Sequence, residues 1–172
     1  EDFLDVLDDD DELAEVTQIS DDEDFDTLTI CTRARHLMNA GEARTAMALL
    51  REHIKEVPQA FRARNMLAIA LYVAGDRDTA LKTAEAVLSE DSENVQAQCT
   101  RILLLHAKGG AAAEEAKEAL DGLTAIDTYT PEELAGVALL QIEYLRYEDA
   151  LVTLRLLAKS MPYDETVLHE TA

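Results

Sequence analysis

Helix-breaking residues and large aromatics are scarce in this sequence: its 172 residues include no tryptophan, three prolines and six glycines. Because Ala, Leu, Glu and Arg are abundant, the composition favours helices. The two cysteines, Cys31 and Cys99, are too few for a disulfide framework, which suits a reducing compartment. Apolar runs stay short of the roughly 18 residues of a membrane-spanning helix. We therefore expect a helical protein without a membrane span, and we take the cytoplasm as its default location.

Basic residues are absent from the first 32 positions, which carry 14 Asp or Glu. From Arg33 onward, 22 acidic residues oppose 15 basic ones, and the net charge of the whole chain is -21. A field of this sign repels nucleic acids and anionic membrane surfaces. We therefore expect protein or peptide partners, particularly basic ones or ones with apolar anchors.

Motifs of catalysis and of metal or cofactor binding are missing as well. The sequence contains no P-loop, no dinucleotide fingerprint, no G-x-S-x-G, no H-E-x-x-H and no C-x-x-C. Cys99 and His106 share one face of a predicted helix, but about 10 Å separate them along its axis. The acidic run Asp8–Glu12 does not fit a calcium loop, because Leu13 stands where that loop needs glycine. We expect no enzyme activity, no metal site and no cofactor.

Against this background, the sequence repeats itself with a period of about 34 residues. Ala46 precedes Pro58 by twelve residues, and Ala150 precedes Pro162 by the same distance. Glycines recur 34 residues apart, at Gly41, Gly75 and Gly109. Several kinds of residue that recur with the same spacing indicate a copied structural unit.

Each unit is predicted to be a pair of helices joined by a short turn. Apolar residues follow a helical stripe in each segment. Thr130, Pro131 and Glu133 form a strong helix start, with a cap, a proline in the first turn and an acid near the helix N-terminus. The predicted pairs are 27–40 with 43–57, 60–74 with 77–90, 94–108 with 111–126, and 131–145 with 147–160.

This arrangement resembles the tetratricopeptide repeat family. The family pattern has small residues where paired helices touch, and the matching positions hold Ala34, Ala68, Ala138, Ala46, Ala80 and Ala150. The sequence departs from the pattern because no aromatic residue opens a repeat, Arg33 stands where leucine is usual, and Ile102 replaces the small residue of the third copy. The resemblance implies an all-α, right-handed solenoid of antiparallel helix pairs with about four degenerate repeats, at 27–60, 61–94, 95–130 and 131–162.

The same resemblance implies that the first helix of each pair lines a concave groove that binds a peptide. We expect about a third of the groove positions that follow from this resemblance to pack against neighbouring helices instead of facing a peptide. The family's groove positions correspond to Leu28, Cys31, Arg35, Met38, Asn39, Arg62, Asn65, Ile69, Tyr72, Gln96, Cys99, Leu103, His106, Ala135, Leu139 and Ile142.

Two segments flank the repeats. The acidic extension of residues 1–26 is interpreted as a cap, a pseudo-ligand or a linker, and its docking on the first repeat or in the groove is a hypothesis. Between Arg33 and Arg64, seven bases oppose three acids, so a complementary surface lies nearby. Residues 163–172 resemble the start of a capping or further helix.

The repeats predict a non-catalytic scaffold or adaptor that binds a peptide or protein segment in its groove. Two alternatives stay open: a secretion or assembly chaperone that shields an apolar client segment, and the regulatory tetratricopeptide part of a longer enzyme. The sequence does not identify the partner, the pathway, the oligomeric state, or whether the chain is a fragment of a longer protein.

Overall fold

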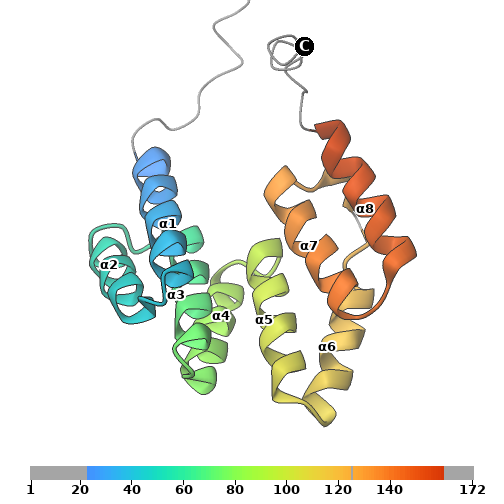
Figure 1. Cartoon of the computed structure of the whole chain (residues 1–172), viewed down its shortest axis with the longest axis horizontal. Coiled ribbons are helices and arrows are strands. Elements are labelled where there is room, and N and C mark those ends of the chain that lie inside the picture. Colours follow the sequence, from blue (N-terminus) through green and yellow to red (C-terminus); the bar gives the residue numbers. More distant parts are fainter. Residues whose placement is uncertain (1–22, 125, 161–172) are drawn as a thin grey trace, which may run out of the picture.

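A computed structural model of the chain describes residues 23–124 and 126–160, and these residues form helices and short connections (Figure 1). A short 3-10 helix, η1 (Ile126–Thr128), precedes the last pair. The α-helices are α1 (Glu23–Asn39), α2 (Ala43–Glu56), α3 (Phe61–Val73), α4 (Arg77–Glu90), α5 (Val95–Lys108), α6 (Ala111–Asp121), α7 (Pro131–Glu143) and α8 (Tyr147–Ser160).

Consecutive helices pack as antiparallel pairs, from α1–α2 at one end of the molecule to α7–α8 at the other (Figure 1). The odd-numbered helices also contact one another in sequence, α1 with α3, α3 with α5 and α5 with α7, so they form one continuous layer. The even-numbered helices lie on the other side of this layer and contact mainly the odd-numbered ones. The predicted fold class, an all-α solenoid of helix pairs, is confirmed.

Alanines hold the helices together at the positions that the repeat pattern requires. Ala34, Ala68 and Ala138 of the odd-numbered helices are almost completely buried. Ala46, Ala80 and Ala150 are the corresponding buried residues of their partners. Because a methyl group takes little space, the two helix backbones of a pair approach closely there. In the third repeat the larger Ile102 fills the same position and is also buried.

Most helix ends lie where the sequence predicts them, to within two residues. The capping box at the start of α7 is present: Thr130 and Glu133 each bond the other's backbone N–H group. Two predicted ends are wrong. Helix α1 begins at Glu23, four residues before the predicted start, so residues 23–26 belong to the first helix. The helix predicted for 111–126 ends at Asp121, because Gly122 ends it and a loop follows.

The turns between paired helices need a backbone conformation that favours glycine. Gly41, Gly75 and Gly109 have φ values of 81°, 91° and 77°. In the fourth repeat the same place is taken by Leu145, with φ 59°. Its N–H group donates to the Ile142 carbonyl oxygen at 2.9 Å, as the Gly41 N–H group donates to Met38. The fourth turn therefore keeps the geometry of the others without their glycine.

The predictions for residues 1–22 and 163–172 lie outside the described residues. Among the helices that the structure describes, we find none that is long and apolar enough to cross a membrane.

Candidate functional site

The odd-numbered helices are tied together by a polar ladder, which we define as Arg62, Gln96 and Glu132. Each of these residues is the second of its helix, in α3, α5 and α7 respectively. Arg62 forms an ion pair with Glu132 and donates to both of its carboxylate oxygens. Gln96 Nε2 lies 3.4 Å from Glu132 Oε2. The ladder thus joins three helices that are distant in sequence.

This ladder also reports the curvature of the odd-numbered layer. Packed neighbouring helices lie about 8–10 Å apart, so α3 and α7 in a flat layer would be separated by about 18 Å, with α5 between them. Arg62 and Glu132 meet directly, which requires that the N-terminal ends of these helices converge. We call the side of the layer that carries the ladder the odd-helix face.

Sequence reasoning proposed Arg62 as a cation available to a partner and did not single out Glu132. The structure instead places Arg62 against Glu132, so its charge is already neutralised within the chain. One signal was available: Arg62, Gln96 and Glu132 stand at the same repeat position, 34 and 36 residues apart. The spacing alone does not predict that Arg62 contacts Glu132, because this contact depends on how α3, α5 and α7 are arranged in space.

Three of the predicted groove residues, Cys31, Asn65 and Cys99, are buried. Asn65 donates to the Asn94 side chain at 3.1 Å. Cys99 lies where α5 meets α7, since a β-carbon added at Gly136 would be 3.6 Å from its sulfur atom. These three residues pack inside the chain and do not reach its surface.

The thiols of Cys31 and Cys99 are both buried, which disfavours the thiolate form. Burial raises the pKa of the Cys99 thiol to about 12 and that of the Cys31 thiol to about 11, although Arg62 and Arg35 act in the opposite direction on Cys31. A thiolate is the nucleophilic form of cysteine. The His106 ring packs against the Tyr144 ring, with centroids 4.5 Å apart and an angle of 49° between the ring planes. This geometry does not support a Cys99–His106 nucleophile.

The remaining predicted groove residues reach the surface to different degrees. Leu28, Arg35, Asn39, Leu139 and Ile142 are exposed. The half-buried members are Met38, Arg62, Ile69, Tyr72, Gln96, Leu103, His106 and Ala135. Away from the ladder, the predicted groove positions are mainly apolar, and the most exposed apolar side chain among them is Leu139, at 65%.

Part of the predicted basic surface near the first repeat is engaged in ion pairs. Lys55 pairs with Glu52, Arg62 with Glu132, and Arg64 with Glu90. Four arginines of this stretch are exposed and form no ion pair within the described residues: Arg33, Arg35, Arg44 and Arg51. The docking of the acidic N-terminal segment stays a prediction.

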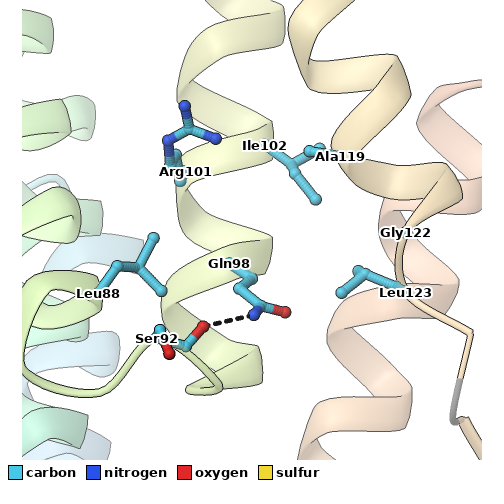
Figure 2. Close-up of a pocket in the computed structure, with 8 residues that line it drawn as sticks. All are labelled: Leu88, Ser92, Gln98, Arg101, Ile102, Ala119, Gly122 and Leu123. Atoms are coloured by element: carbon cyan, nitrogen blue, oxygen red, sulfur yellow. Dashed lines mark hydrogen bonds between the residues drawn. The ribbon is translucent and has the colours of Figure 1, made fainter.

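A pocket of about 340 Å³ lies on the opposite side of the layer, between α4, α5 and α6 (Figure 2). Sequence reasoning missed it, since it depends on how α4 and α6 flank α5 while making little contact with each other. The polar groups of Gln98 and Arg101 already have protein partners. Gln98 donates to the Ser92 carbonyl oxygen at 2.7 Å. The lining residues are Leu88, Ser92, Gln98, Arg101, Ile102, Ala119, Gly122 and Leu123.

Arg101 at this pocket links helices rather than offering a free charge. It pairs with Glu85 of α4 at 3.9 Å and with Glu115 of α6. Through these contacts, Arg101 of α5 connects α4 with α6. Elsewhere, no cluster of His, Cys, Asp or Glu among residues 23–124 and 126–160 is arranged to hold a metal ion.

Comparison with known proteins agrees with the repeat geometry. No protein-family model matches the chain. A TPR repeat-containing protein of Bacillus subtilis, YvcD, is 33% identical over 104 residues, which is 60% of this chain. The chain has tetratricopeptide-type repeats. The match spans 21% of the length of that relative, so this chain corresponds to only part of it.

Proposed function

We propose that the chain is a non-catalytic interaction module that binds a protein segment with apolar anchors on its odd-helix face. The observation that carries this proposal is the apolar surface away from the ladder, with Ile69, Tyr72 and Leu103 half-buried and Leu139 largely exposed. The tetratricopeptide-type repeats support a general role in protein interaction. The apolar character of the face supports the choice of anchors.

The ladder sets the place of the anchors on this face. Arg62 and Glu132 neutralise each other at the N-terminal ends of the odd-numbered helices, so this end offers little to an apolar side chain. The apolar residues lie further along the same helices. An amphipathic or extended segment that places Leu- or Ile-sized anchors there gains about 1.5–3 kcal/mol for each side chain that becomes fully buried.

Replacement of Leu139 by Asp tests this surface. We would select binders from a library of displayed 12-residue peptides and measure the Kd of the best one by fluorescence anisotropy. Because Leu139→Asp removes an exposed anchor site and adds a charge, we expect affinity to fall by at least about 10-fold. The fold should survive, since Leu139 is 65% exposed.

Val152→Asp is the matched control. Val152 is also exposed, but it lies on α8, an even-numbered helix. The Val152→Asp substitution introduces the same charge and should leave the Kd of the selected peptide unchanged. Equal affinity of the wild type and Leu139→Asp, or a library that yields no enriched binder, would count against the odd-helix face as the binding surface.

A further inference from the structure

The third repeat carries a charged bridge where the second repeat has apolar packing. Leu67 of α3 and Leu81 of α4 pack against the same apolar cluster. One repeat later, 34 residues on, the matching positions hold Arg101 of α5 and Glu115 of α6, which form an ion pair. Arg101 also pairs with Glu85 of α4. The pocket between α4, α5 and α6 therefore lies beside an ion-paired bridge instead of a continuous apolar contact.

The walls of this pocket are apolar although the bridge is charged. Leu88 and Leu123 lie on opposite sides of the pocket (Figure 2), and Ile102 and Ala119 extend the apolar lining. Leu88, Ala119 and Leu123 are half-buried, so solvent reaches them. An apolar group that covers them removes this area from water, which is favourable.

The size and the polar groups of the pocket favour a side chain over a small polar molecule. Its volume of about 340 Å³ is at the lower end of small-molecule sites, which measure about 300–1,000 Å³. Gln98 already donates to the Ser92 carbonyl oxygen at 2.7 Å, and Arg101 is paired with two carboxylates. The pocket therefore offers an apolar surface and few free hydrogen-bonding groups.

The charged groups around the pocket are mainly acidic. Among the lining residues Arg101 is the only base, and two carboxylates share its charge. Glu118, next to Ala119, is exposed and forms no ion pair among the residues that the structure describes. Glu115, Glu118 and Gly122 have the spacing of one helix face, and Gly122 lines the pocket. A rim of this charge attracts lysine and arginine and disfavours an anionic ligand.

We propose that this pocket is a second protein-binding surface, which takes a basic segment of another protein. One apolar side chain of the segment inserts between Leu88 and Leu123, and neighbouring lysine or arginine residues pair with Glu115 and Glu118. The apolar anchor supplies most of the affinity, because exposed ion pairs contribute little, and the charges select a basic partner. The proposal does not depend on the odd-helix face, which lies on the opposite side of the layer.

A defined peptide tests this surface. The peptide has one central leucine with two lysines on each side, and it is titrated into the isotope-labelled 172-residue chain while amide chemical shifts are recorded. We expect saturable shift changes at Leu88, Ile102 and Leu123. The same peptide with a central serine should bind at least about 10-fold more weakly, because it lacks the apolar anchor. Equal affinity of the two peptides, or shifts spread evenly over the acidic residues of α8, would overturn the proposal.

A substitution that fills the pocket separates the anchor site from the charge around it. Ala119→Leu adds carbon atoms to the lining, so it should weaken the leucine peptide at least about 10-fold and leave the serine peptide unchanged. Ala86→Leu is the matched control, because Ala86 is exposed on α4 and does not line the pocket. Equal Kd values of the wild type and Ala119→Leu for the leucine peptide would contradict insertion of the anchor.

A charge reversal on the rim leaves the core untouched. Glu118→Lys should lower the affinity of the leucine peptide about 2- to 5-fold, and less at high salt, because an exposed attraction becomes a repulsion. Glu148→Lys makes the same change of net charge on α8, where Glu148 is also exposed, and should leave the Kd unchanged. Equal effects of the two reversals would show that overall charge alone attracts the peptide, against the proposal.

Dilution distinguishes a basic partner from a second copy of this chain. With the occupant proposed here, the amide shifts of Leu88 and Leu123 stay constant when the chain is diluted without peptide. Shifts at these residues that change with protein concentration would identify a second copy as the occupant and overturn the proposal.

Discussion

Leu145 occupies a position where the three preceding repeats have glycine. Its φ of 59° lies in the left-handed region, where the β-carbon of an L-residue crowds the following carbonyl oxygen at a cost of roughly 1–2 kcal/mol. The side chain recovers little of this cost by packing, since it is 70% exposed. Leu145 is therefore a point of local strain in the fourth turn.

Leu145→Gly should stabilise the chain. Glycine removes the steric cost but loses about 0.5–1 kcal/mol through its larger freedom in the unfolded state, so we expect a net gain of about 0.5–1 kcal/mol. Urea-induced unfolding followed by circular dichroism measures this change. The reverse substitution Gly75→Leu is the control and should destabilise, because an added β-carbon at Gly75 meets no atom within 4 Å and only the backbone conformation is penalised. A loss of stability in Leu145→Gly would contradict the strain.

At the scale of single helices, α2 and α4 differ in one hydrogen bond at their N-termini. Asp76 caps α4 by accepting a hydrogen bond from the Thr79 N–H group at 3.2 Å. Glu42 occupies the same repeat position before α2 and makes no such bond. The two residues carry the same charge and differ by one methylene group, so the length of the side chain separates a capped helix from an uncapped one.

Glu42→Asp should therefore add a cap to α2. Its sequence context repeats that of α4, with Thr45 in the place of Thr79. We expect a gain of about 0.5–1 kcal/mol in the free energy of unfolding, typical of a side-chain cap at this position. Thermal and urea unfolding measure it. Asp76→Glu, which should lose a similar amount, is the matched reversal, and two changes of the same sign would refute the explanation.

The helix ends show what local sequence predicts well. Thr130 and Pro131 announce the start of α7, because capping and a fixed proline φ act within one turn of the chain. The turn at Leu145 was harder to recognise from glycine spacing, since the residue type that normally reveals a left-handed turn is absent there. The early end of α6 was missed although Gly122 marks it, because the apolar residues Leu123 and Ile126 continue the helical pattern.

At the scale of the whole molecule, the polar ladder links α3 to α7 across α5. Arg62 and Glu132 are both partly exposed, so their pair contributes little to stability, on the order of 0–1 kcal/mol. Its effect on shape is expected to be larger, since it joins helices that do not pack directly against each other. In the proposed function, the ladder separates the charged end of the odd-helix face from the part that binds apolar anchors.

Charge reversal in the ladder should open the array. Spin labels at Arg33→Cys on α1 and Val152→Cys on α8 report the distance between its ends, and the buried native thiols should react slowly because their pKa values are raised to about 11 and 12. We expect Arg62→Glu to lengthen this distance by repulsion from Glu132, most clearly at low salt. The double variant Arg62→Glu with Glu132→Arg should restore it. An unchanged distance in Arg62→Glu would show that packing alone sets the curvature.

The repeat period, the helix pairs and the small residues between them followed from the sequence by itself. Each depends on interactions within one or two turns or on the alternation of apolar residues along a helix, and both leave a local record in the chain. Ala68 and Ala80, for example, are assigned to the core by their place in the repeat alone.

Only the tertiary structure decided which of the predicted groove positions reach the surface. Arg62 meets Glu132 across 70 residues, Asn65 turns to Asn94, and Cys99 packs beside Gly136. These outcomes depend on the angles at which successive pairs stack, and small rotations add up along the array until distant side chains meet or separate. No single residue or spacing determines the total rotation between distant helix pairs, so these contacts are known only once all the helices are in place.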